Sequence, residues 1–177
     1  RVGILTGGGD CSGLNAVVRA ITRTAIIQHK ATVVGIEDGF DGLIFDRHQE
    51  LSTSNTKNIL SLGGTIIGTT NKGNPFKYRE RDANGKIQVR DYSNKAVENL
   101  KKLNLDCLFI VGGDGTLQIA NRFHEMGLPV IGIPKTIDND LKETDYSFGF
   151  HTAVQVASDA IDRLQTTGRS HDRVMIL

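Results

Sequence analysis

Short apolar segments recur along this chain, and most are followed by a glycine-rich or polar loop and then by a helical pattern. They are rich in valine and isoleucine and cover residues 2–5, 33–36, 107–111, 130–133 and 174–177. Strands that are covered on both faces of a sheet have this composition. Between them, apolar residues at three- and four-residue steps predict helices within residues 14–25, 97–103, 117–123 and 153–164. The alternation predicts an α/β fold, a three-layer sandwich around a mostly parallel sheet.

The composition limits the partners and the compartment. The chain has 177 residues, enough for one domain with a buried core. Its net charge of +1 does not indicate the basic surface that binds nucleic acid. No apolar run approaches the roughly 18 residues of a membrane span. Cys11 and Cys107 are far apart and have no metal-binding spacing, which favours a reducing compartment, the cytoplasm. The chain stops within the apolar run 174–177, so we expect it to be part of a longer protein.

Residues 71–93 interrupt the alternation of strands and helices. The segment contains Gly73, Pro75 and many charges, and Asn84-Gly85 stands between residues 78–82 and 86–90. Asn-Gly between two short extended segments is typical of a hairpin turn. We interpret the segment as a surface excursion that carries a hairpin, with a lid as one functional interpretation.

Three predicted strands end in loops suited to phosphate, at residues 6–13, 112–116 and 134–140. In a parallel sheet these loops leave from the same edge, where ligands bind at the point at which the strand order reverses. Glycines in the first two loops let backbone N–H groups approach phosphate oxygens, and each of these loops opens a predicted helix, whose N-terminus favours anions. Two such loops side by side predict a polyphosphate site, although each loop alone is also compatible with a plain tight turn.

Acidic residues in these loops are candidates for the chemistry. Asp114 stands among three glycines and is a candidate ligand of Mg²⁺ on phosphates, because hard cations take oxygen ligands; an Asx turn is the alternative. Asp138 and Asp140 lie two residues apart, so in an extended segment both carboxylates point the same way. One would take a proton from a substrate hydroxyl and the other would orient the substrate, with a solvated acidic turn as the alternative. Lys135 and Thr136 beside them suit phosphoryl transfer, which depends on positioning and charge neutralisation.

Two further features leave alternatives open. Arg173 precedes the last apolar segment and can hold a phosphate with two hydrogen bonds, but a surface arginine is an equal interpretation. Gly7, Gly9 and Gly13 have the spacing of a dinucleotide-binding loop, and Glu37 follows the next predicted strand in the place of a ribose-binding acid. This pattern would indicate an NAD-dependent dehydrogenase of the Rossmann type, but it leaves the second and third loops unexplained.

Together the motifs resemble the 6-phosphofructokinases. They follow that family's order over nearly the whole chain, at residues 8–16, 63–65, 112–116, 134–140 and 170–175. The Thr-Ile-Asp-Asn-Asp element followed by Ser-His-Asp-Arg is the most specific, whereas NAD kinases and lipid kinases also carry a Gly-Gly-Asp-Gly-Thr loop. The resemblance implies the N-terminal part of a phosphofructokinase-like fold, with a donor-binding domain and the start of the sugar-phosphate site in residues 1–177.

The resemblance also implies an activity and roles for single residues. The family phosphorylates the 1-hydroxyl of fructose 6-phosphate, a step of glycolysis. By resemblance, Asp138 is the general base, Thr136, Ile137 and Asp140 contact the sugar, and Arg173 grips the sugar phosphate across a subunit boundary. The residues that match the donor site are Gly8, Lys72, Gly113, Asp114, Gly115, Thr116 and Lys135, with Asp114 near Mg²⁺. A homo-oligomer, a dimer or a tetramer, is expected of the complete protein, and little activity of this piece alone.

The resemblance leaves the donor as ATP or pyrophosphate. Glycine at the position of Gly115 goes with ATP, since a side chain there would occupy the space of the α-phosphate, whereas lysine at the position of Lys135 is typical of pyrophosphate users. Some ATP-using lineages combine both residues, so we predict ATP. Ser12 stands where proline is usual, and Lys72 is the candidate substitute for an arginine that contacts the nucleotide. A nucleotide-sensing module without catalysis is a further alternative.

Overall fold

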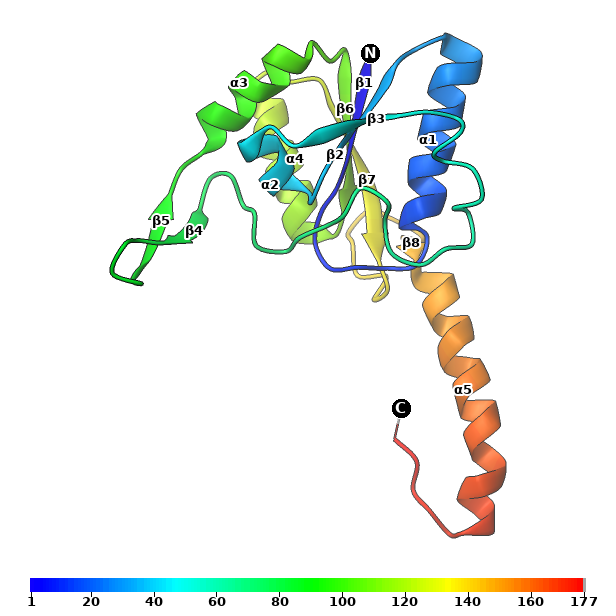
Figure 1. Ribbon diagram of the computed structural model, residues 1–177. Coiled ribbons are helices and arrows are strands. Elements are labelled where there is room, and N and C mark those ends of the chain that lie inside the picture. The colour runs from blue at the N-terminus through cyan, green and yellow to red at the C-terminus, as the bar shows by residue number, and fades with distance from the viewer. Residues whose placement is uncertain (177) are drawn as a thin grey trace.

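A six-stranded sheet forms the centre of the computed structural model, which describes residues 1–176 (Figure 1). Its strands are β1 (Val2–Thr6), β2 (Val33–Ile36), β3 (His48–Leu51), β6 (Cys107–Gly112), β7 (Val130–Thr136) and β8 (Phe148–Gly149). Across the sheet the order is β3-β2-β1-β6-β7-β8, and β3 pairs antiparallel with β2 while the other pairs are parallel. The chain moves from β1 to one side and returns to its other side at β6, so the strand order reverses between these two strands.

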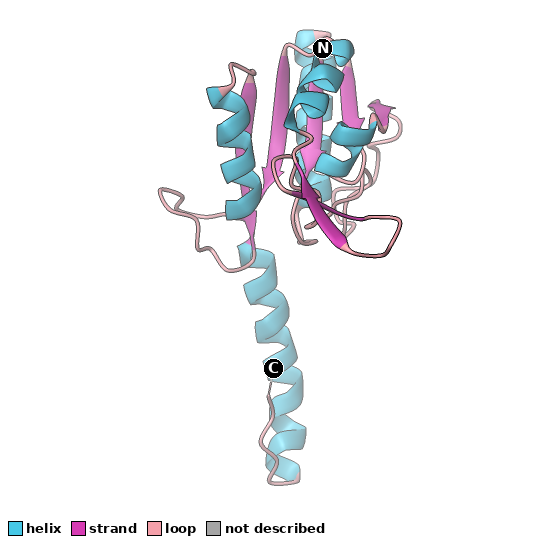
Figure 2. Ribbon diagram, turned by 90° about the vertical axis from the view of Figure 1, so that its left-hand side faces the viewer, coloured by secondary structure: helices cyan, strands magenta, loops and turns pink. Residues whose placement is uncertain are grey.

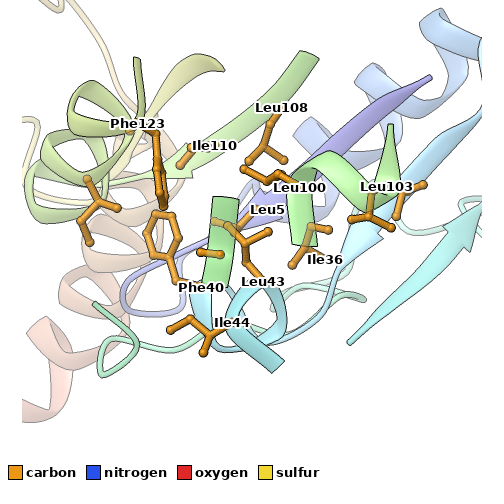
Figure 3. Close-up of a cluster of buried hydrophobic side chains, with 14 of the residues drawn as sticks. Leu5, Ile36, Phe40, Leu43, Ile44, Leu100, Leu103, Leu108, Ile110 and Phe123 are labelled. Atoms are coloured by element: carbon orange, nitrogen blue, oxygen red, sulfur yellow. The ribbon is translucent and has the colours of Figure 1, made fainter. Parts of the chain in front are cut away.

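Helices cover both faces of the sheet, and a long helix leaves the body. They are α1 (Leu14–His29), α2 (Phe40–Phe45), α3 (Ser93–Leu103), α4 (Asp114–Glu125) and α5 (Phe150–Ser170). The pleat of β1 sends Ile4 to the α1 face and Leu5 to the face that α2, α3 and α4 cover. Figure 3 shows Leu5 among the buried side chains of that second face. Burying one such side chain contributes roughly 1.5–3 kcal/mol. The predicted three-layer α/β fold with a mostly parallel sheet is confirmed.

The predicted hairpin is also confirmed, and its base is anchored. Strands β4 (Tyr78–Arg81) and β5 (Ile87–Arg90) pair antiparallel. The rings of Phe45, Tyr78 and Tyr92 pack against one another where the hairpin meets the body, with centroids 5.4–6.3 Å apart. The Tyr92 hydroxyl donates to Glu80 at 2.9 Å, and the Tyr92 N–H donates to the carbonyl of Pro75 at 2.7 Å. Figure 2 shows the hairpin crossing in front of the body, and these contacts favour a fixed arm over a freely hinged lid.

The predictions for the last apolar segment and for several short elements are wrong. Residues 174–176 form no strand, and Val174 and Ile176 are 90% and 92% exposed; Leu177 lies outside the described residues. Among residues 1–176 no strand pairs with them, so their apolar composition does not produce a strand. The sequence pattern also missed α2, β8 and the edge strand β3, which is the polar segment His48–Leu51 and pairs along only one side. Among the described residues, no helix combines the length and the apolar character needed to cross a bilayer.

Candidate functional site

A hollow of about 310 Å³ lies at the edge of the sheet where the parallel strands end. Segments far apart in the sequence contribute its lining, which consists of Gly8, Gly9, Phe40, Thr70, Asn71, Gly73, Asn74, Gly113, Asp114, Gly115, Thr116, Ile119, Lys135 and Thr136. The Gly7 N–H donates to the carbonyl of Val111 at 2.9 Å, which holds the loop after β1 against β6. The two predicted glycine loops therefore meet at the point where the strand order reverses.

The glycines of the two loops have different tasks. Gly8 adopts φ 86°, a left-handed conformation that glycine takes without strain. A Cβ on Gly112 would collide with the side chain of Thr116, so Gly112 makes room for the threonine. At Gly115 a Cβ would meet nothing within 4 Å, so the hollow stays open there. The first turn of α4 includes Gly115 and Thr116, and its backbone N–H groups have no partners within the helix, which suits an anion.

Lys135 places a buried positive charge at this site. The residue is 5% exposed, and its Nζ donates to the carbonyl of Gly9 at 2.6 Å. Among residues 1–176 it forms no ion pair with a carboxylate. A buried ammonium without a counter-charge carries a desolvation cost that an anion offsets. The hollow is therefore prepared for a negatively charged ligand.

The predicted Mg²⁺ residue lies at the rim of the hollow. The Asp114 carboxylate is exposed, and the side-chain amide of Gln118 donates to it at 2.7 Å. The residues described contain no group of three or more His, Cys, Asp or Glu side chains that could enclose a metal. Because Mg²⁺ is usually held by one or two carboxylates together with substrate phosphates, a single carboxylate beside a phosphate site fits this ion.

The segment that carries Asp138 and Asp140 is a turn, so the condition under which both carboxylates would point the same way is not met. β7 ends at Thr136, and Asn139 adopts φ 52°. The Asn139 amide donates to the carbonyl of Asp145 at 3.1 Å and its Oδ1 accepts the Ser147 N–H at 2.9 Å. Asparagine tolerates this conformation because its side chain bonds to the nearby backbone. Asn139 thus closes the loop, a role that its position between two candidate acids concealed.

The structure brings most of the residues predicted for the donor site to the hollow. It does not bring all of the residues predicted for the sugar site there. Lys72 lies between two lining residues and does not itself line the hollow. Asp138 and Ile137 are exposed just beyond Thr136, and the Asp138 N–H donates to Thr136 Oγ1 at 3.1 Å. Asp140 lines a neighbouring hollow, which it shares with Asp114.

Arg173 is remote from these residues. It follows the far end of α5, whose 21 residues span about 30 Å and lead away from the body (Figure 1). The Arg173 N–H donates to the carbonyl of Gly168 at 2.9 Å, which turns the chain back beside the helix. The part of the chain described here therefore contains no sugar-phosphate site that includes Arg173.

Cys11 is a buried neighbour of the site. Burial raises the pKa of its thiol above the ordinary value of 9.0, while the charge of Lys135 lowers this pKa and the charges of Asp10 and Asp138 raise it. The thiol therefore stays protonated at neutral pH, in agreement with a packing role.

Some lining residues carry no motif and were missed. Phe40 begins α2, Thr70 directly precedes the excursion of residues 71–93, and Asn74 lies within it. Phe40 follows β2, which ends at the same edge as β1, so the same-edge rule could have included it. Glu37, the candidate ribose-binding acid after β2, does not line the hollow. The structure therefore gives no support for a dinucleotide-binding acid there.

Comparisons with known proteins agree with this arrangement. A relative from Clostridium perfringens, "ATP-dependent 6-phosphofructokinase 2", is 51% identical over all of this chain and 48% of its own length. A relative from Dictyoglomus thermophilum, "Pyrophosphate--fructose 6-phosphate 1-phosphotransferase", is 48% identical over all of this chain and 47% of its own length. The solved phosphofructokinase of Saccharomyces cerevisiae superposes with a TM-score of 0.83 at 28% identity, over 97% of this chain and 25% of the yeast chain.

The matches cover all of this chain but only part of each relative. The chain spans about half the length of the curated relatives it matches. The fold is shared with the yeast structure over 97% of this chain. Because the family model "Phosphofructokinase" matches residues 1–177, this chain belongs to the phosphofructokinase family.

Proposed function

We propose that the complete protein transfers the terminal phosphoryl group of ATP to the 1-hydroxyl of fructose 6-phosphate, and that residues 1–177 bind the donor and carry the general base. The observation that carries this proposal is the Lys135 ammonium, which is buried beside two glycine loops and has no carboxylate partner within residues 1–176. A polyphosphate supplies the missing negative charge. The names of relatives such as the one from Clostridium perfringens support phosphoryl transfer from ATP.

The lining of the hollow favours a nucleotide as donor. The open space at Gly115 leaves room for a chain of phosphates, and the free N–H groups of the first turn of α4 can donate to their oxygens. Phe40 and Ile119 also line the hollow, but both side chains belong to the core, at 4% and 8% exposed.

We assign the acceptor chemistry to the turn after β7. The Asp138 carboxylate takes the proton of the sugar hydroxyl, while Thr136, Ile137 and Asp140 hold the sugar in place. Thr136 supports this assignment because it lines the hollow and accepts the N–H of Asp138, which joins the donor site to the base. Alignment of the hydroxyl with the donor, and neutralisation of the negative charge of the phosphates, then supply most of the catalysis.

Asp114 is our candidate protein ligand for Mg²⁺. The ion would neutralise charge on the donor phosphates when bound. Gln118 holds the carboxylate from the side of the helix, so the acid can face the hollow that it lines. Gly8, Gly113, Gly115, Thr116 and Lys135 would contact the phosphates, with Lys72 at the outer wall.

A pyrophosphate-dependent enzyme is the second candidate. Lysine at the position of Lys135 is typical of pyrophosphate users in the family that this chain resembles. The relative from Dictyoglomus thermophilum, 48% identical, is named for pyrophosphate. The open glycine at position 115 favours ATP.

We also propose that α5 packs on parts of the complete enzyme outside residues 1–177, and that Arg173 reaches the sugar phosphate across a subunit boundary of a homo-oligomer. The exposed apolar side chains of α5 support a covered helix: Val154, Val156 and Ile161 are 46%, 63% and 55% exposed. The two free cysteines are compatible with the cytoplasm as the compartment.

An assay of the complete protein with fructose 6-phosphate, comparing ATP with pyrophosphate, tests the proposal. We expect turnover with ATP, and an Asp138→Asn variant slower by about 10²- to 10⁴-fold with donor affinity unchanged within about twofold. Asp145→Asn, an exposed aspartate of the same loop, is the matched control and should stay near the native rate. A near-normal rate of Asp138→Asn would remove the base assignment, and no turnover with either donor would overturn the function.

A further inference from the structure

The first residues of α1 and α5 lie against each other. They adjoin the loop after β1, residues 7–13, which we call the donor loop, on the side away from the hollow. Both helices begin after a left-handed glycine, Gly13 with φ 91° and Gly149 with φ 107°. A Cβ on Gly13 would lie 3.7 Å from the backbone nitrogen of Gly149. A Cβ on Gly149 would collide with Cys11 Sγ and would lie 2.9 Å from the carbonyl oxygen of Ser12. The close approach therefore requires glycine at position 149.

Two side chains of the donor loop bind the segment that precedes α5. The Ser12 hydroxyl donates to the carbonyl of Gly149 at 3.2 Å, and the Cys11 thiol lies 3.7 Å from the carbonyl of Phe148. We call these contacts at Phe148 and Gly149 the root of α5. Beyond the root, few contacts support the helix, because Gly168 is its only buried residue. The contacts at the root therefore determine the direction in which the helix leaves the body (Figure 1).

The same loop faces the donor on its other side. Gly8 and Gly9 line the hollow, and the carbonyl of Gly9 accepts the hydrogen bond from Lys135. An anion in the hollow competes with this carbonyl for the ammonium, so the loop differs in its bonding between the free and the loaded site. A ligand can change the conformation at a second site only if its own site differs between the free and the loaded state, as this hydrogen bond would.

We propose that Ser12 is a positioning residue, whose hydroxyl ties the direction of α5 to the conformation of the donor loop and thereby to the sugar-phosphate end of the helix. The identity of the two ligands rests on the proposed function, whereas the tie between loop and helix does not. Small changes at the root become large at the far end, because a tilt of about 5° moves the end of a ~30 Å helix by about 3 Å. That end leads to Arg173.

The first measurement concerns the tie itself and needs no activity. In Ser12→Ala, amide hydrogen exchange of residues 154–157, the first amides of α5 with partners within the helix, should be about fivefold faster in the complete protein than in the native protein, the factor that one hydrogen bond supplies. Ser12→Thr retains a hydroxyl and should restore the native exchange. Ser158→Ala removes a hydroxyl that bonds only to Val154 within α5, and it serves as the matched control, without effect on residues 154–157. Unchanged exchange in Ser12→Ala would overturn the proposal.

The second measurement separates positioning from simple structural support. In Ser12→Ala, the KM for fructose 6-phosphate should rise about fivefold while the KM for ATP stays within about twofold, and Ser12→Thr should restore the native value. A rise in the KM for ATP alone, or no change in either, would contradict the coupling. If the native protein turned over neither substrate, the proposed function would fail, and the exchange measurement would still decide whether Ser12 ties the loop to the helix.

Discussion

At the scale of single residues, Lys135 shows how burial turns an ordinary side chain into a functional one. A lysine on the surface has water around its ammonium, but this one is 5% exposed and contacts only a backbone carbonyl among the described residues. If it served the fold alone, its replacement by an apolar residue of similar length would lower stability. If it serves a ligand, the replacement lowers affinity and leaves stability unchanged or higher, because the desolvation cost of the charge disappears.

For Lys135→Met we therefore expect donor affinity to fall by about 10- to 100-fold, as the loss of a charge-assisted hydrogen bond implies. The free energy of unfolding should change by no more than about 1 kcal/mol or should rise. Titration calorimetry and denaturant unfolding measure the two quantities. Lys142→Met, an exposed lysine on the loop after β7, is the control and should alter neither. A loss of stability with native affinity would show that the lysine is structural.

Gly115 tests the shape of the hollow in a different way. A Cβ there meets nothing within 4 Å, so Gly115→Asp should leave the fold intact while its carboxylate enters the space of the phosphates. We expect the KM for ATP to rise at least about tenfold, and the KM for pyrophosphate to rise less. Gly63→Asp adds the same group at another open glycine outside the hollow, and should behave as the native enzyme. Unaffected use of ATP by Gly115→Asp would disprove the steric argument.

At the scale of elements, the hairpin combines a fixed base with a tip that depends on one carboxylate. Asp82 accepts the N–H groups of Asn84 and Lys86, each at 2.9 Å, and the side-chain amide of Gln88 at 3.0 Å. These bonds, first that of Lys86, lower the pKa of Asp82 below its ordinary value of 3.8. The Asp82 carboxylate thus accepts N–H groups at the hairpin tip that have no strand partner.

A group with a lowered pKa in the folded state stabilises that state when it is ionised. The contribution of Asp82 should therefore be present above pH 3.8 and be lost as the pH falls through the lower pKa of the folded hairpin. Amide exchange of residues 82–88, followed between pH 5 and about pH 2, should show the hairpin tip loosening before the body of the protein. Asp82→Asn should loosen the tip and remove this pH dependence; a native pH profile in that variant would contradict the assignment.

At the scale of the whole molecule, α5 is the element least supported by the rest of the described chain. Figures 1 and 2 show it leaving the sheet from the edge that carries the hollow, with the last residues returning beside it. Its apolar side chains, Ile161 among them, have no core to enter. A helix with an apolar face of this kind is normally covered.

We expect Ile161→Lys to leave the stability of residues 1–177 alone unchanged within about 0.5 kcal/mol, since the side chain is 55% exposed there. In the complete protein the same change should cost at least about 2 kcal/mol, because a buried apolar contact is replaced by a charge. Unfolding in denaturant, with size-exclusion chromatography for assembly, measures both. Thr152→Lys lies nine residues earlier, on the opposite side of the helix, and is the control. Equal behaviour of the two variants in the complete protein would show that the Ile161 face stays uncovered.

The amino-acid sequence by itself determined the four central strands, the covering helices α1, α3 and α4, and the two glycine loops of the donor site. These features depend on local chemistry: apolar residues at a regular period, and glycines where the backbone must approach a ligand. The loop after β7 was located for the same reason, but its conformation was not, because the turn at Asn139 depends on bonds to Asp145 and Ser147.

Only the tertiary structure decided which remote residues share the hollow. Phe40 and Asn74 carry no motif and reach the site because α2 and the excursion pack beside the two loops. The same holds for the contact of Ser12 with Gly149, which joins segments 137 residues apart, and for residues 174–176, whose apolar composition predicted a strand that finds no partner. Burial and pairing require a neighbour, and the neighbour of a residue is a property of the folded chain.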